Sequence, residues 1–171
     1  MQTITISITK ATVLDEVAKT TDYTGSKLIG TDASARDRIF ATDDDLETLD
    51  RFWDDAVVGL EERFREVFNS ADTTDGTYNF KCERSDKYNS SLNNSVTDAV
   101  MSYFVAYIVG RWFNFVNKEG VADYLTLADD GLATAERLLY NRKRPSRPQS
   151  GTPRPLPNPE PEAKPEEKEE S

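Results

Sequence analysis

The sequence predicts a mainly α protein: a bundle of three to four helices with a small two-stranded β element, followed by a disordered C-terminal tail. Three long segments place apolar side chains at spacings of three and four residues, the period of an amphipathic helix. Two short segments alternate apolar and polar side chains, the period of a half-buried strand. All eight prolines lie between positions 145 and 165, and proline is scarce inside helices. We therefore predict a helical domain with short strands over residues 1–144 and a disordered Pro/Glu-rich tail over residues 145–171.

The two predicted strands cover residues 3–9 and 77–84. In the first strand, isoleucine alternates with threonine or serine. In the second strand, Tyr78, Phe80 and Cys82 alternate with polar residues. Each strand offers one apolar face, so the two strands are expected to pair. Because a two-stranded sheet is marginal by itself, it is expected to pack on the helices.

A short helix is predicted over residues 13–18, where an acidic first turn follows a threonine. Residues 20–40 are predicted to be irregular, because Gly25 and Gly30 are expected to interrupt regular structure.

A long amphipathic helix is predicted over residues 43–69, with a cap at Thr42 and a turn over residues 69–76. Its first turn carries three carboxylates, Asp43–Asp45. Consecutive helical side chains point about 100° apart and do not converge on a metal ion. Stabilisation of the helix N-terminus therefore explains them more simply. The carboxylates of the 69–76 segment fit the spacing of a calcium loop only in part, so a turn is predicted there.

Two more helices are predicted over residues 91–118 and 121–142. From Ala99 onward the first of them is apolar on nearly all sides, which indicates either a central helix or a subunit interface. Aromatic residues and arginine are enriched at interface hot spots, although ordinary core packing is the alternative for each aromatic. A membrane span is not expected, because the stretch contains Arg111 and Asn114. The candidate interface residues are Tyr103, Tyr107, Arg111, Trp112, Phe113 and Phe115.

A basic neck leads from the last helix into an acidic tip. Cations stabilise a helix C-terminus, and the same residues are suited to docking on an acidic partner or on nucleic acid. The candidate docking residues are Arg142, Lys143, Arg144 and Arg147.

Composition argues against most enzymes. The chain has no histidine, one cysteine (Cys82) and a net charge of −10. The commonest general base and metal ligand is therefore missing, and neither a cysteine-based zinc site nor an intrachain disulfide is possible. An acidic chain is also repelled by phosphate backbones. We predict no catalytic residue, cofactor or metal, no secretory signal, and a reducing cytosol as the compartment.

Several features occur together: a short N-terminal strand, the stretch VLDEVAKTTDYTGSK over residues 13–27, an Asp-rich helix entry followed by Phe52 and Trp53, a long aromatic helix, and an ending LLYNRKRPSRP over residues 138–148. In this combination the chain resembles small structural proteins of phages and prophages of gut Bacteroidetes. Its helical architecture is similar to that of the head–tail connector (adaptor) proteins of tailed phages. The N-terminal strand and the acidic tail are departures from the simplest all-helical connectors, and they leave the position in the virion open.

The resemblance implies a structural virion assembly protein that forms a homo-oligomeric ring between the portal and the tail. The implied partners are the portal or a neighbouring tail protein, with no membrane involved. DNA would pass through the ring without sequence-specific binding, since acidic subunits present negative potential to it. The implied location is the neck of the virion, or the host cytoplasm during assembly.

Two other classes of function stay open at this point. A protein-interaction module that is not part of a virion would have the same composition. An enzyme that uses carboxylates, such as a nuclease, would need separated Asp or Glu residues to converge in a cleft.

Overall fold

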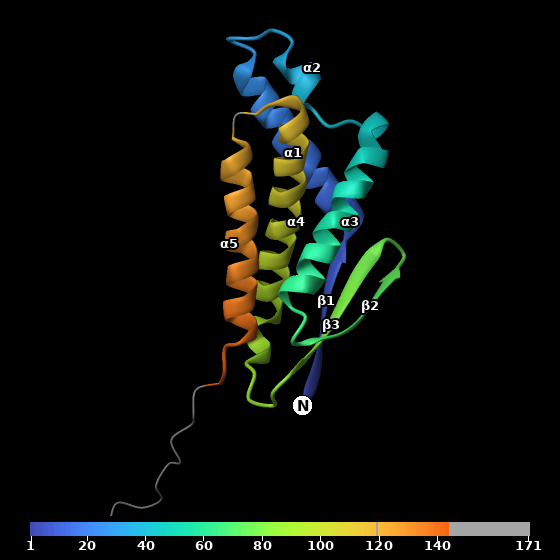
Figure 1. Cartoon of the computed structure of the whole chain (residues 1–171), viewed down its shortest axis with the longest axis vertical. Helices are drawn as coiled ribbons and strands as arrows, with labels where there is room; N and C mark the ends of the chain where they lie inside the picture. Colours follow the sequence, from blue (N-terminus) through green and yellow to red (C-terminus); the bar gives the residue numbers. More distant parts are fainter. Residues whose placement is uncertain (119, 144–171) are drawn as a thin grey trace, which may run out of the picture.

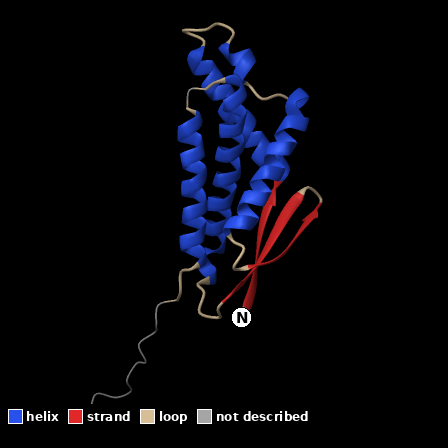
Figure 2. Ribbon diagram, viewed as in Figure 1, coloured by secondary structure: helices blue, strands red, loops and turns tan. Residues whose placement is uncertain are grey.

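The computed structural model describes residues 1–118 and 120–143. The chain is mainly helical, as predicted, with four long helices and a sheet at one end of them (Figures 1 and 2). The predicted tail over residues 145–171 lies outside the described residues. In chain order the elements are β1 (Gln2–Thr9), α1 (Lys10–Leu28), α2 (Ala35–Ile39), α3 (Leu46–Arg63), β2 (Phe68–Thr74), β3 (Thr77–Arg84), α4 (Asn93–Val116) and α5 (Val121–Leu139), with 3-10 turns at Asp43–Asp45 and Ser90–Leu92.

The sheet is antiparallel, with the strand order β1-β3-β2. The predicted pairing of the two alternating segments is confirmed, since each isoleucine of β1 lies opposite a buried residue of β3, for example Ile6 opposite Phe80. These side chains form the inner face, where Phe80 also contacts Phe64 beyond the end of α3. The prediction of only two strands is wrong, because β2 adds a third strand where a turn was expected. Most of the side chains of β2 are polar, so the segment lacks the alternation of a half-buried strand.

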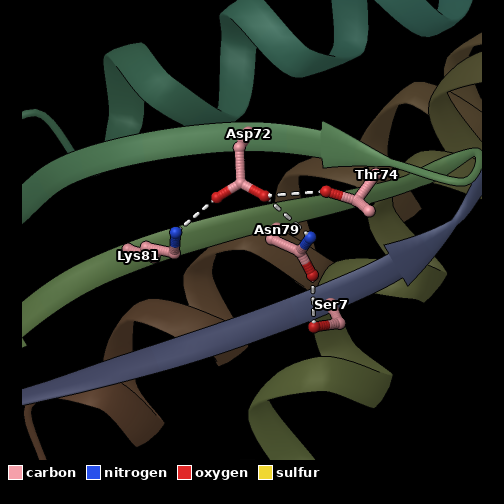
Figure 3. A network of polar contacts seen from close by, with 5 residues as sticks. All are labelled: Ser7, Asp72, Thr74, Asn79 and Lys81. Carbon is pink, nitrogen blue, oxygen red and sulfur yellow. Dashed lines mark hydrogen bonds and ion pairs between the residues drawn. The ribbon is translucent and has the colours of Figure 1, made fainter.

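The outer face of the sheet carries a polar network that joins all three strands (Figure 3). The carboxylate of Asp72 accepts hydrogen bonds from Lys81 Nζ and from Asn79 Nδ2, the latter at 3.1 Å. Asn79 Oδ1 accepts from Ser7 Oγ at 2.7 Å. The hydrogen bond from Lys81 is the main cause that lowers the pKa of Asp72 below its ordinary value. This carboxylate, considered above for a calcium loop, is thus part of a sheet network.

The predicted irregular segment over residues 20–40 is a second correction. α1 continues through Gly25 to Leu28, and α2 follows. A Cβ atom at Gly25 would lie 2.8 Å from the Cα of Arg36, so the glycine allows α1 and α2 to approach closely. Packing against α2, rather than interruption of the helix, explains this glycine.

The carboxylates at Asp43–Asp45 form a 3-10 turn that leads into α3. Asp45 Oδ2 accepts from the Thr42 backbone N–H at 3.0 Å and from the Thr42 hydroxyl at 2.9 Å, which confirms the predicted cap. Within the parts of the chain that the structure describes, no three His, Cys, Asp or Glu side chains gather closely enough to hold a metal ion.

α4 is the central helix. It packs against α5, α1, α3 and β1, and buries side chains on several sides, including Ala106, Ile108 and Val109. The segment Ser90–Val116 is long and apolar enough to cross a membrane, but 56% of its most apolar window is buried inside the fold, and a buried core helix passes the same test. Burial on several sides accounts for a helix that is apolar nearly all round.

The thiol of Cys82 gives a testable pH dependence. Cys82 is fully buried, and its burial raises the pKa of the thiol to about 11. An unfolded cysteine titrates near pH 8.5. Between these two values the unfolded chain releases a proton that the folded chain keeps, so the free energy of unfolding should fall as the pH rises. Denaturant titrations at about pH 8 and about pH 10 measure this fall. It should be smaller in Cys82→Ala, and an equal fall in both proteins would contradict the assignment.

Candidate protein interface

Four of the six predicted interface residues lie on one stripe of α4. Tyr103, Tyr107, Arg111 and Phe115 recur every fourth residue, so they share one face of the helix. That face lies between α3 and α5, which flank α4 in Figure 1. The four side chains thus lie in one row along α4, as their four-residue spacing indicates.

The other two predicted residues belong to the core. Trp112 and Phe113 are buried within the chain. Trp112 Nε1 donates a hydrogen bond to the backbone carbonyl of Ile39 at 2.7 Å, and the ring of Phe113 packs edge-on against Tyr124 of α5. The structure places these two side chains inside the fold, where α5 and the C-terminal end of α2 cover their side of α4.

Tyr103 is the residue of the stripe nearest the N-terminus of α4, and it is also buried. Its hydroxyl donates to the backbone carbonyl of Ala56 at 3.0 Å, and its burial raises the pKa of the phenol above its ordinary value. A Cβ atom at Gly59 would lie 2.5 Å from this hydroxyl, so glycine leaves room for it. Tyr103 therefore connects α4 to α3 within the chain.

Toward the C-terminal end of α4 the stripe opens to solvent. Phe115 is 70% exposed although its ring stacks on Phe52 of α3, with centroids 5.8 Å apart. Arg111 Nη2 lies 3.2 Å from Asp55 Oδ2, and the guanidinium also lies over the rings of Phe52 and Tyr107, at 5.7 and 6.0 Å. We call these five residues, Phe52, Asp55, Tyr107, Arg111 and Phe115, the aromatic–arginine cluster.

The cluster continues into a groove of about 610 Å³ between α3 and α5, which we call the α3–α5 groove. Tyr103 and Tyr107 lie on the side of α4, and Leu125 and Leu132 on the side of α5. An ion pair between Arg63 and Glu136, with Nη2 and Oε2 2.6 Å apart, joins α3 to α5 near this groove. An exposed arginine-bearing aromatic surface next to an open groove is the type of surface that binds proteins.

A second groove lies on the other flank of α5. It has a volume of about 470 Å³ and lies between α1, α4 and α5; we call it the α1–α5 groove. α5 packs chiefly on α4 and so leaves both grooves open. No local pattern in the sequence predicts this groove. Met101, Val105 and Leu127 are apolar residues that face outward from the core. Their positions in the sequence indicate a groove only once the packing of α1 and α5 beside α4 is known.

The basic neck begins within the described residues. Arg142 and Lys143 expose their side chains, while the backbone N–H of Lys143 donates to the carbonyl of Lys87 at 2.8 Å. Tyr88 and Arg142 form an isolated antiparallel bridge. The start of the neck is therefore tied to the loop after β3. Arg144 and Arg147, the other predicted docking residues, lie outside the described residues.

Comparison with known proteins found no match, whether to a family model, a curated protein or a solved structure.

Proposed function

We propose that this chain is a structural assembly protein that associates with copies of itself through the aromatic–arginine cluster, in the manner of a ring-forming head–tail connector. The observation that carries the proposal is Phe115, a large aromatic side chain that is 70% exposed beside Arg111. Buried aromatics and arginine dominate binding energy at protein interfaces.

The surroundings of Phe115 support a binding surface. Phe52, beneath the Phe115 ring, is itself buried, so a partner would add a second layer of apolar contact to a fixed base. Arg111 is held over that base by Asp55 and by two aromatic rings, so little side-chain entropy would be lost when a partner binds.

The charge of the chain fits a ring through which DNA passes. A net charge of −10 per chain gives an assembled ring a strongly negative potential. Phosphate backbones would be repelled from its walls, and sequence-specific binding would be disfavoured. In this proposal the exposed side chains of Arg142 and Lys143 dock on the portal or on a neighbouring tail protein.

The test compares self-association of the wild type with that of Phe115→Asp by sedimentation velocity. We expect the substitution to raise the dissociation constant about thirtyfold, or ~2 kcal/mol, because it places a charge at a hot spot. Tyr140→Asp is the matched control, since Tyr140 is an aromatic residue that is 46% exposed and lies outside both the cluster and the two grooves. Identical sedimentation of the wild type and Phe115→Asp would contradict the proposal and favour a module that binds other proteins.

A further inference from the structure

The α1–α5 groove has the chemistry to receive an aromatic side chain. Met101 and Val105 of α4 line it on one side, and Leu127 of α5 on the other. Leu127 is 54% exposed, so the groove carries apolar surface that its own chain does not cover. Burying such surface is favourable because it removes apolar area from water.

The charged residues of this groove are all acidic within the described part of the chain. Glu16 of α1 and Asp98 of α4 line it, and neither lysine nor arginine does. Glu16 contacts Lys19, with Oε1 and Nζ 2.8 Å apart. Asp98 has no ion-pair or hydrogen-bond partner among the described residues. A partner that brings an apolar side chain and a cation together would satisfy both parts of the groove.

The aromatic–arginine cluster offers that combination. Phe115 projects an exposed ring, and Arg111 lies one helical turn away on the same face. We infer that Phe115 of one copy docks into the α1–α5 groove of a second copy, with Arg111 of the first copy facing Asp98 and Glu16 of the second. This inference rests on the proposed function and assigns the second surface of the self-association.

A symmetric contact explains the two surfaces less well. In a two-fold dimer the cluster would face another cluster, which sets arginine against arginine and leaves the α1–α5 groove open. A head-to-tail contact pairs ring with apolar groove and cation with carboxylate. Such heterologous contacts use two different surfaces per subunit, and they close into a ring when the rotation between subunits allows it. The cluster and the α1–α5 groove use different faces of α4, so one subunit can use both at once.

Cross-linking between two cysteine variants tests the pairing. Lys118→Cys lies near Phe115 at the end of α4, and Asp123→Cys lies one turn from Leu127 on α5, so both docking side chains are kept. Cys82 is fully buried and stays as an internal, unreactive thiol. The two variants are mixed, treated with a short bismaleimide and separated by mass. Ala133→Cys, at an exposed position of α5 outside the groove lining, replaces Asp123→Cys in the control mixture.

We expect at least about tenfold more covalent dimer from the first mixture than from the control, and loss of that dimer when Phe115→Asp is added to Lys118→Cys. Two results would overturn the inference while self-association stands: Lys118→Cys linking to itself as well as to Asp123→Cys, or a wild type that associates while the mixture gives no excess dimer. A wild type that stays monomeric at every concentration, together with no cross-link, would overturn both the inference and the proposed function.

Discussion

Replacing Phe104 with alanine is expected to lower the free energy of unfolding by about 3–5 kcal/mol, the usual cost of deleting a fully buried phenyl ring. Phe104 has no exposed surface, and its ring lies 4.6 Å from that of Trp53, measured between centroids. The cavity would lie where α4 meets α3. The cost is large because the close-packed neighbours collapse only in part.

Phe115→Ala provides the matched control for Phe104→Ala on the same helix. Phe115 is largely exposed and loses mainly its stacking on Phe52, so its removal should cost less than about 1 kcal/mol. Chemical denaturation at a concentration where the chain is monomeric measures both changes. If the two variants lost similar amounts of unfolding free energy, the result would contradict the placement of Phe104 in the core and of Phe115 on the surface.

A leucine at Gly131 is expected to force α5 away from α4. A Cβ atom at Gly131 would lie 3.2 Å from the carbonyl oxygen of Ala99 and 3.2 Å from the backbone nitrogen of Tyr103. These neighbours are backbone atoms and cannot turn aside. We expect a loss of about 1–3 kcal/mol in the free energy of unfolding, as for overpacking in a close contact.

Gly131→Leu should also weaken self-association, because α5 forms one wall of each groove. Gly131→Ala is the control: it places only the Cβ atom in this contact, and helix propensity favours alanine over glycine, so its loss should be smaller than that of leucine. Thermal unfolding and sedimentation of both variants measure the two effects. Gly131→Leu with wild-type stability and association would show that α5 does not pack as closely as the structure has it.

Much of the fold could be predicted from local patterns. α3, α4 and α5 bury a helical repeat of apolar residues, and β1 and β3 alternate, so their predicted positions are close to those found, except that α3 ends at Arg63 and not at residue 69. β2 was not predicted because most of its side chains are polar and only Phe68 and Ala71 pack against the core. The dipeptide Asp75-Gly76, with φ of 49° and 72°, forms its two-residue hairpin turn, and this Asp-Gly signal would have located the third strand.

Other elements depend on contacts distant in the sequence. α1 extends past Gly25 because α2 packs against it, which no local propensity indicates. The candidate site shows the same division. A four-residue spacing groups Tyr107, Arg111 and Phe115, but the burial of Trp112 depends on Ile39, 73 positions earlier. Spacing predicts which residues share a face, and only the placement of α3 and α5 decides which of them reach solvent.

The central claim is that this chain associates with itself. The most direct test is the native mass of the purified full chain over a wide range of concentrations, followed by negative-stain imaging of the largest species. We predict a discrete oligomer whose mass is a whole multiple of 19.3 kDa and whose images show a closed ring with a central hole. A chain that remains monomeric at every concentration would contradict the claim.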